Sequence, residues 1–109
     1  MSRPFGEKST VYDHTDFTVA TATTDYDVAT NNAGWLSSIK AQNGTAVCGK
    51  IRLVTDQTIT VKFNSTSADG IVVTSSESPF VVEDLVIRNV FISNTSGNTA
   101  NVKITQFLI

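Results

Sequence analysis

One stretch decides the fold, Thr58-Ile59-Thr60-Val61-Lys62-Phe63, because its apolar and polar side chains alternate without a break. Successive side chains of a β-strand point to opposite faces, so Ile59, Val61 and Phe63 share one face and the polar residues share the other. A strand that is apolar on one face only is typical of an antiparallel sheet that packs on a core. The stretch therefore predicts a half-buried antiparallel strand.

Segments of the same kind recur along the chain, separated by polar turns, and a sustained helical period is missing. We expect strands over residues 17–22, near 26–28, and over 45–54, 58–64, 71–74, 80–82, 85–92 and 99–105. Short strands at even spacing are typical of a β-sandwich or jelly roll. The sequence thus predicts an all-β fold, a single antiparallel β-sandwich of jelly-roll type over residues 16–109.

The dipeptide Asn43-Gly44 predicts a hairpin, because both residues accept the positive φ that a type I′ turn demands. We therefore pair residues 35–41 with the strand over 45–54, although the segment around Trp35 fits either a strand or one helical turn. The phase of the strand over 45–54 puts Cys48 on the face opposite its apolar residues. Those apolar positions are Val47, Gly49, Ile51 and Leu53.

Residues 1–15 mix Pro4, Gly6 and polar side chains without a period, which predicts an extended N-terminal arm. The arm carries two aromatic residues, Phe5 and Tyr12. They either dock on a neighbouring subunit or cap the core edge of their own subunit, and we include both in a predicted subunit interface.

The stretch Leu85–Ile92 is apolar on both faces. Such a strand is either the doubly covered centre of a sheet or part of a contact between subunits. Because a chain of 109 residues has few layers to cover a second face, we expect the contact. We assign Leu85, Ile87 and Phe91 to this interface.

The C-terminal segment adds a second apolar group. The strand over 99–105 places Ala100, Val102 and Ile104 inward, and the residues after it break this phase. A bulge near Gln106, or a tail that packs on a partner, would account for the break. We therefore add Phe107, Leu108 and Ile109 to the predicted interface.

Composition excludes several classes of partner. The net charge is −2 and the 8 basic residues are scattered, whereas nucleic-acid binding needs a concentrated positive field. Charged residues make up 17%, and Ser, Thr and Asn take their place, which favours flat contacts between neutral subunit surfaces. No stretch has the length of a membrane span, and the first residues lack the apolar run of a signal peptide. We expect no nucleic-acid or membrane partner.

Candidate chemistry is sparse. His14 lies between Asp13 and Asp16, but a metal site needs further ligands from a rigid element, so we expect a solvated or hydrogen-bonded role. We interpret Asp25 and Asp27 as charges that protect an edge strand rather than as a calcium or glycosidase pair.

The single cysteine, Cys48, has no histidine near it in sequence and excludes an internal disulfide. We therefore predict no catalytic residues, no metal and no cofactor.

Three segments resemble small virion proteins of tailed bacteriophages, namely residues 53–64, 86–97 and 100–104. In those proteins an aspartate-led turn precedes an alternating strand, as Asp56 does here. A late hairpin ends the sheet, with a loop like Asn94-Thr95-Ser96-Gly97. The resemblance covers the C-terminal half and is a pattern of β residues rather than a chemical signature.

The resemblance implies a capsid decoration or cement protein of jelly-roll or related fold, or a small tail or fibre component. We expect a virion structural protein, not an enzyme. It would be made in the host cytoplasm, bind the major capsid protein on the capsid surface and act as a homo-oligomer, a dimer or trimer. The alternative is a carbohydrate-binding β-sandwich module in which Trp35 stacks on a sugar.

Overall fold

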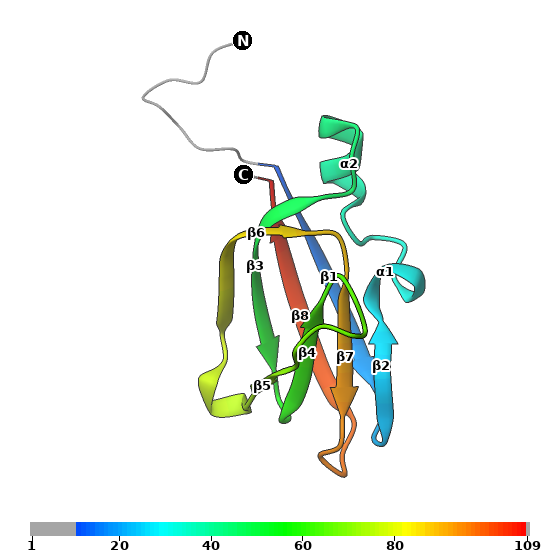
Figure 1. Cartoon of the computed structure of the whole chain (residues 1–109), viewed down its shortest axis with the longest axis vertical. Helices are drawn as coiled ribbons and strands as arrows, with labels where there is room; N and C mark the ends of the chain where they lie inside the picture. Colours follow the sequence, from blue (N-terminus) through cyan, green and yellow to red (C-terminus); the bar gives the residue numbers. More distant parts are fainter. Residues whose placement is uncertain (1–10, 109) are drawn as a thin grey trace.

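Two antiparallel sheets of four strands face each other in the computed structural model, which describes residues 11–108 (Figure 1). Sheet I contains, in order, β1 (Tyr12–Val19), β8 (Ala100–Phe107), β3 (Cys48–Thr55) and β6 (Phe80–Ile87). Sheet II contains, in order, β2 (Thr23–Asp27), β7 (Val90–Asn94), β4 (Ile59–Phe63) and β5 (Ile71–Val73). The chain also forms helices α1 (Val28–Asn31) and α2 (Ser37–Asn43) and a single 3₁₀ turn, η2 (Ser75–Glu77).

The strands pair as one long hairpin that has been rolled up. Strand β4 pairs with β5, β3 with β6, β2 with β7 and β1 with β8, all antiparallel. Two further pairings, β3 with β8 and β4 with β7, close the roll into its two sheets. This nested order is the jelly-roll topology, so the predicted all-β sandwich is confirmed.

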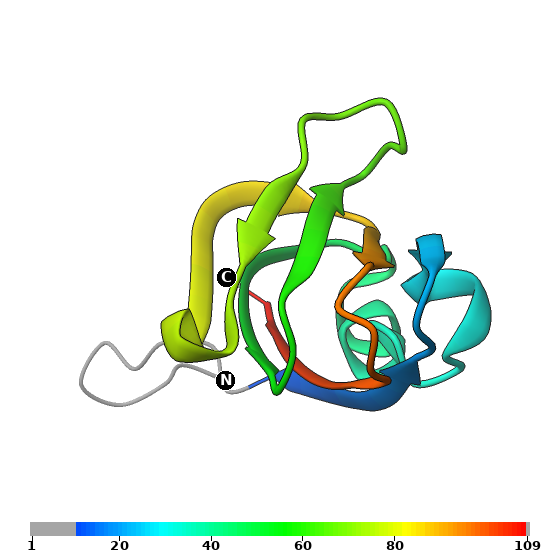
Figure 2. The same ribbon diagram turned by 90° about the horizontal axis from the view of Figure 1, so that it is seen from below.

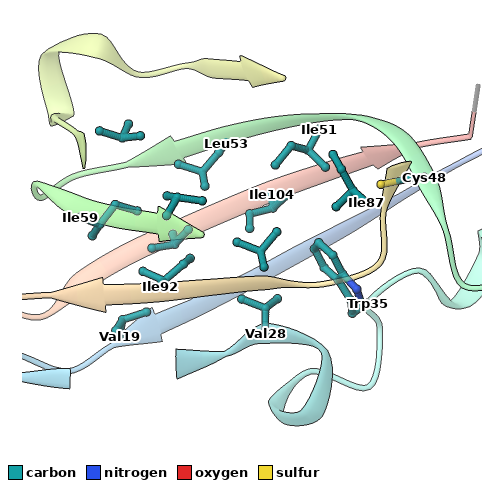
Figure 3. Packing of buried hydrophobic residues seen from close by; sticks show 14 of the residues in the cluster. Val19, Val28, Trp35, Cys48, Ile51, Leu53, Ile59, Ile87, Ile92 and Ile104 are labelled. Carbon is teal, nitrogen blue, oxygen red and sulfur yellow. The ribbon is translucent and has the colours of Figure 1, made fainter. Parts of the chain in front are cut away.

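The core lies between the sheets, and alternation along the strands fills it (Figure 3). In β4 the inward residues Ile59 and Val61 are buried, as the sequence pattern predicts. In β8 the predicted inward set is buried in the same way, namely Ala100, Val102 and Ile104. Burial of these side chains stabilises the fold by about 25 cal/mol for each Å² of apolar surface removed from water.

Strand β1 begins at Tyr12, earlier than predicted, so residues 12–15 belong to the sandwich and not to an arm. The strand pairs with β8 from Tyr12 opposite Phe107 to Val19 opposite Ala100. The start was missed because two of its inward residues, Asp13 and Thr15, are polar. They are tolerated inside because each hydrogen-bonds to the protein, as described below.

The Asn43-Gly44 hairpin prediction is wrong. Residues 37–43 form α2, and Gly44 ends this helix with φ 81° while its N–H donates to the Lys40 carbonyl at 2.7 Å. A left-handed residue is as useful at a helix C-terminus as in a type I′ turn, and glycine suits both. The same dipeptide therefore stops a helix here, and no strand precedes it.

The predicted phase of β3 is also wrong at its start. A register shift lies between Cys48 and Lys50, so Cys48 turns inward with Ile51, and its side chain is buried. A bulge of this kind inserts residues and moves the side chains that precede it to the other face.

The stretch Leu85–Ile92 is not one strand. It breaks at Arg88 and Asn89, where the chain leaves β6 in sheet I and enters β7 in sheet II (Figure 1). The side chain of Asn64 holds this corner, because its amide donates to the Val86 carbonyl at 2.8 Å and its oxygen accepts the Arg88 N–H at 2.7 Å. The run is apolar on both faces because it supplies two different sheets.

Strand β8 continues without the predicted bulge. Gln106 follows Ile104 on the inner face and is fully buried. Its oxygen lies 3.3 Å from both the Thr15 hydroxyl and the Leu36 N–H, which donate to it, and its amide donates to the Ile104 carbonyl at 2.6 Å. A polar residue holds an inward position here because all of its hydrogen bonds are made inside.

The two open sides of the sandwich differ. Helices α1 and α2 close the side formed by β1 and β2, where Val28, Leu36 and Ile39 join the core. On the other side the edge strands are β5 of sheet II and β6 of sheet I, and η2 lies in the connection between them (Figure 2). Within residues 11–108 no helix covers these two strands.

Candidate functional site

His14 is held on the outer face of sheet I. Its Nε2 lies 2.6 Å from an Asp16 carboxylate oxygen, and its Nδ1 lies 3.0 Å from the Thr105 hydroxyl. A third ligand is missing, since the described residues contain no group of three or more His, Cys, Asp or Glu side chains placed to hold a metal ion. The adjacent hollow, lined by residues 16–18 and 101–103, is open and shallow.

Asp13, which precedes His14 in sequence, points inward to α2. Its two carboxylate oxygens accept the backbone N–H groups of Ser38 at 3.0 Å and Ile39 at 2.9 Å. The carboxylate therefore satisfies the start of α2, which no side chain of its own caps. The histidine and Asp13 lie on opposite faces of β1 and do not form a site together.

Asp25 and Asp27 take separate structural roles. Asp25 pairs with Lys62 at 3.2 Å on sheet II. Asp27 caps α1, because its carboxylate accepts the Thr30 N–H at 3.0 Å, and it also accepts the Asn89 amide at 2.8 Å. Neither carboxylate faces the other across a space that a substrate would occupy.

Cys48 is buried among core side chains at one end of the sandwich (Figure 3). Burial raises the pKa of its thiol to about 11. A thiol with this pKa stays protonated at neutral pH, and the thiolate is the nucleophilic form. The side chain therefore acts as a small apolar residue of the core.

Trp35 is 8% exposed, and its Nε1 donates to the Arg88 carbonyl at 3.0 Å. Its ring points into the core beside Ile87 (Figure 3). A sugar-stacking platform needs an open ring face, so the predicted glycan contact at Trp35 is wrong. The residue anchors the segment between α1 and α2 to the corner between β6 and β7.

The predicted interface residues do not form one surface. Ile87 is fully buried and belongs to the core of its own chain, which corrects its assignment. Leu85 is 37% exposed on β6, and Phe91 is half-buried on β7. Leu108 packs against the core, and its N–H donates to the Val11 carbonyl at 3.1 Å. Phe5 and Ile109 lie outside the described residues.

Tyr12 and Phe107 form an aromatic pair on the outer face of sheet I. Their ring centroids are 6.3 Å apart, and the Lys50 ammonium lies 5.3 Å from the centre of the Phe107 ring. Tyr12 is 59% exposed. The two aromatic residues therefore meet as the register of β1 and β8 requires, and Tyr12 lies at the opposite edge of sheet I from Leu85.

The exposed apolar side chains gather on the side that no helix covers. Six large apolar residues of the described chain are exposed, and all except Tyr12 lie on β5 and β6. We call these five residues the apolar edge: Ile71, Val72, Val81, Leu85 and Val86. Grouped exposed apolar residues mark a contact surface more often than residues scattered singly.

Sequence reasoning found only Leu85 of this group. The signal for the others is the one that singled out Leu85–Ile92, because the short segment Ile71-Val72-Val73 is apolar on both faces as well. Val81 and Val86 were assigned to strands but not to a surface. Which strands lie at the sheet edges depends on the long-range pairing, which the sequence pattern does not show.

The residues that carry the phage resemblance make turns at one end of the sandwich. Asp56 accepts the Asn101 N–H at 2.8 Å and the Asn101 side-chain amide at 2.7 Å, so it ties the β3–β4 turn to β8. Asn94 donates to the Val19 and Asn98 carbonyls at 2.9 and 2.7 Å. Gly97 has φ 88°, which suits glycine in the loop between β7 and β8. In this chain these residues are thus determinants of the fold.

Hydrogen bonds lower the pKa values of two aspartates, Asp27 and Asp56. The Asn89 amide lowers the pKa of Asp27, and the Asn101 amide lowers that of Asp56. A carboxyl whose pKa is lower in the folded protein stabilises the fold above its unfolded pKa, and this stabilisation is lost as the pH falls through the folded value. We expect the free energy of unfolding to be constant from about pH 7 to about pH 5 and to decrease below about pH 4.

Urea unfolding is followed by circular dichroism at several pH values from about pH 7 to about pH 3, which measures this dependence. Asp56→Asn should reduce the decrease in acid, because it removes one titrating group. Asp69→Asn is the control, since Asp69 is exposed in the polar loop between β4 and β5. An unchanged acid decrease in Asp56→Asn would show that Asp56 does not contribute.

Comparisons with known proteins add no relative: no protein-family model, no curated protein and no solved structure matches this chain. Among residues 11–108, neither the length nor the apolar character of any helix suffices to cross a membrane.

Proposed function

We propose that this protein is a structural component of a phage particle, a decoration or cement protein that binds the capsid shell. Three features support the proposal. The fold is a jelly roll, an architecture that capsid and lectin domains share. The C-terminal half resembles small phage virion proteins at turn residues such as Asp56 and Asn94. Five of the six exposed large apolar residues of the described chain lie on the edge strands β5 and β6.

The apolar edge is the strongest support for the proposal. A chain that works by contact needs a surface whose burial is favourable, and the exposed apolar side chains of the edge strands β5 and β6 supply it. In contrast, the titratable residues His14, Asp25 and Asp27 are already paired within the chain. The molecule is thus equipped for association rather than for group transfer.

The proposed mechanism is mechanical. On the capsid surface the protein would bridge adjacent copies of the major capsid protein and add buried area where internal pressure separates them. A contact of standard size buries about 1,600 Å² in total, which is enough for specific and stable binding. The chain is rich in Ser, Thr and Asn, and exposed side chains of this kind can form the polar rim of an interface.

Co-sedimentation tests this role. Purified protein is mixed with empty capsid shells of the phage that encodes it, and the pelleted fraction is measured at increasing protein concentration. We expect saturable binding with a fixed ratio of protein to capsid subunits, and shells that resist heat or low salt better when coated. Protein that stays in the supernatant at every concentration would overturn the proposal.

The same experiment with purified tails separates the alternative position in the particle. A small tail or fibre component would pellet with tails and not with shells. The variant Val72→Asp should still fold, because Val72 is 59% exposed. A loss of pelleting with this variant would place the apolar edge in the contact. Thr18→Asp, an exposed position on the far strand β1, is its control.

A further inference from the structure

We propose that two copies of this chain associate edge to edge through β6, with a two-fold axis at Val81, so that their two copies of sheet I form one continuous sheet. This inference rests on the proposed structural role and names the self-contact that such a role would use. It commits to a second copy of this chain as the occupant of the β6 edge.

The edge of sheet I at β6 is free. Strand β6 pairs with β3 on one side, and no strand of the described chain follows it on the other. An edge strand presents unpaired N–H and C=O groups, which are a template for another strand. The opposite side of the sandwich has helices α1 and α2 beside its edge strands, whereas β6 has neither.

Only a short part of β6 is straight enough to pair. Residues 80–83 run in unbroken register against β3, from Phe80 opposite Leu53 to Glu83 opposite Lys50. Asp84 then adopts φ 60°, and the register shifts before Ile87 meets Cys48. At the other end Pro79 has no N–H to donate. A partner strand can therefore pair from Pro79 to Glu83 and no further.

The two faces of this segment differ. Val81 and Glu83 are exposed, while Phe80 and Val82 are half-buried on the core side. In an antiparallel pair, residues directly opposite each other have side chains on the same face. A two-fold pair of β6 strands must therefore match the outer residues with each other and the inner residues with each other.

Within residues 79–83 a register centred on Val81 pairs all five residues, whereas registers centred on Phe80 or Val82 pair three and one centred on Glu83 pairs only one. A register centred on Glu83 places two carboxylates directly opposite, which destabilises the pair. A register centred on Val82 places Glu83 against the partner's Val81 and Asp84 against the partner's Phe80. The register centred on Val81 has neither fault and pairs the longest segment, so the length of pairing and the absence of opposed carboxylates together select it.

In the Val81 register every cross-strand neighbour is compatible. Val81 meets the partner's Val81 on the outer face, and Phe80 meets the partner's Val82 on the inner face. Glu83 lies opposite the partner's Pro79 and stays beside Lys50 of its own chain, its neighbour on β3. The exposed apolar face of Val81, which is 43% accessible, is then covered.

Solution mass of the full chain is the first test, by size-exclusion chromatography with light scattering over a concentration series. We expect a dimer that dissociates on dilution. Val81→Lys should raise the dissociation constant by about tenfold or more, because it places two like charges face to face on the axis. Thr18→Lys should leave it unchanged, since Thr18 is exposed on β1 at the far edge of the same sheet.

Disulfide trapping tests the register itself. Directly opposite Cα atoms in an antiparallel pair are about 4.5–5.5 Å apart, within the range of a disulfide, so Val81→Cys should form a covalent dimer on oxidation. In the same register two Glu83 positions are offset along the strands by about 13 Å, so Glu83→Cys should not. Cys48 is 1% exposed and does not interfere in the folded protein.

Each outcome decides the matter. A wild-type monomer throughout the series, an unaffected Val81→Lys dimer, or better trapping with Glu83→Cys than with Val81→Cys would overturn the inference. A monomer that still pellets with capsid shells would leave the proposed function standing without this contact. A trapped dimer that binds neither shells nor tails would retain the contact and remove the virion role.

Discussion

Ile104→Ala should lower the free energy of unfolding by about 2–5 kcal/mol, the largest effect we expect from a single substitution. Ile104 is fully buried on β8, the strand that pairs with both β1 and β3. Truncation removes apolar surface and leaves a cavity that the two sheets cannot fill, because their spacing is fixed by the surrounding core residues. Urea unfolding at neutral pH, followed by circular dichroism, measures the loss.

Lys103→Ala is the matched control, because Lys103 precedes Ile104 on the same strand and points to solvent. Its effect should stay within about 0.5 kcal/mol. If both variants lost the same stability, propensity for the strand would explain the result rather than burial between the sheets. A loss below about 1 kcal/mol in Ile104→Ala alone would contradict the packing described here.

Asp13→Ala should destabilise the protein by about 2–3 kcal/mol, because it leaves buried N–H groups without an acceptor. The carboxylate is 7% exposed and accepts from Ser38 and Ile39 at the start of α2. Without this carboxylate the N–H groups of Ser38 and Ile39 have no side-chain acceptor. The turn of α2 that places the fully buried Ile39 in the core is then less stable. Chemical unfolding gives the size of the effect.

Two comparisons make this prediction specific. Asp16→Ala removes an exposed carboxylate from the outer face of the same strand and should have little effect on stability. Asp13→Asn keeps an acceptor oxygen but loses the charge, so it should fall between Asp13→Ala and the wild type. Tryptophan fluorescence adds a local readout, because Trp35 lies just before α2. An Asp13→Ala protein as stable as Asp16→Ala would refute the capping role.

The parts of the fold that follow from local alternation were predictable. Ile59, Val61 and the inward residues of β8 have the burial that their spacing indicates, and the sandwich class follows from them. Alternation is reliable at these positions because one face is apolar and the other polar, so a shift by one residue would expose the whole apolar set. The N-terminal half lacks that contrast, since β1 places polar Asp13 and Thr15 inside.

The mistakes have a common physical origin, which is that polar residues and turn dipeptides acquire their roles from partners distant in sequence. Gln106 looks like the end of a strand, but it is an inner residue satisfied by Thr15 and by the Leu36 N–H. Asn43-Gly44 is compatible with a hairpin or a helix end, and packing of Ile39 on the core selects the helix. No local pattern contains these contacts.

The candidate site shows the same limit more strongly. The sequence indicated that two-sided apolar segments serve contacts between subunits, and this criterion fits Ile71-Val72-Val73 as well as Leu85–Ile92. It failed for Ile87, which is buried, because the corner between β6 and β7 uses apolar residues for two sheets at once. The alternative glycan contact at Trp35 failed for a different reason, because a single tryptophan in a turn region carries no information on whether its ring faces solvent or the core.

The nested pairing of strands has a consequence for how the chain acquires its structure. Strand β1 has one partner, β8, and their pairing joins residues as far apart as Tyr12 and Phe107, separated by 95 positions. During synthesis the first strand must wait for the last, while the β4–β5 hairpin can close as soon as it leaves the ribosome. Folding is therefore completed only once β8 is available, on the slow millisecond-to-second scale of proteins dominated by distant contacts, and until then the edges of β1 and β3 stay open to other chains.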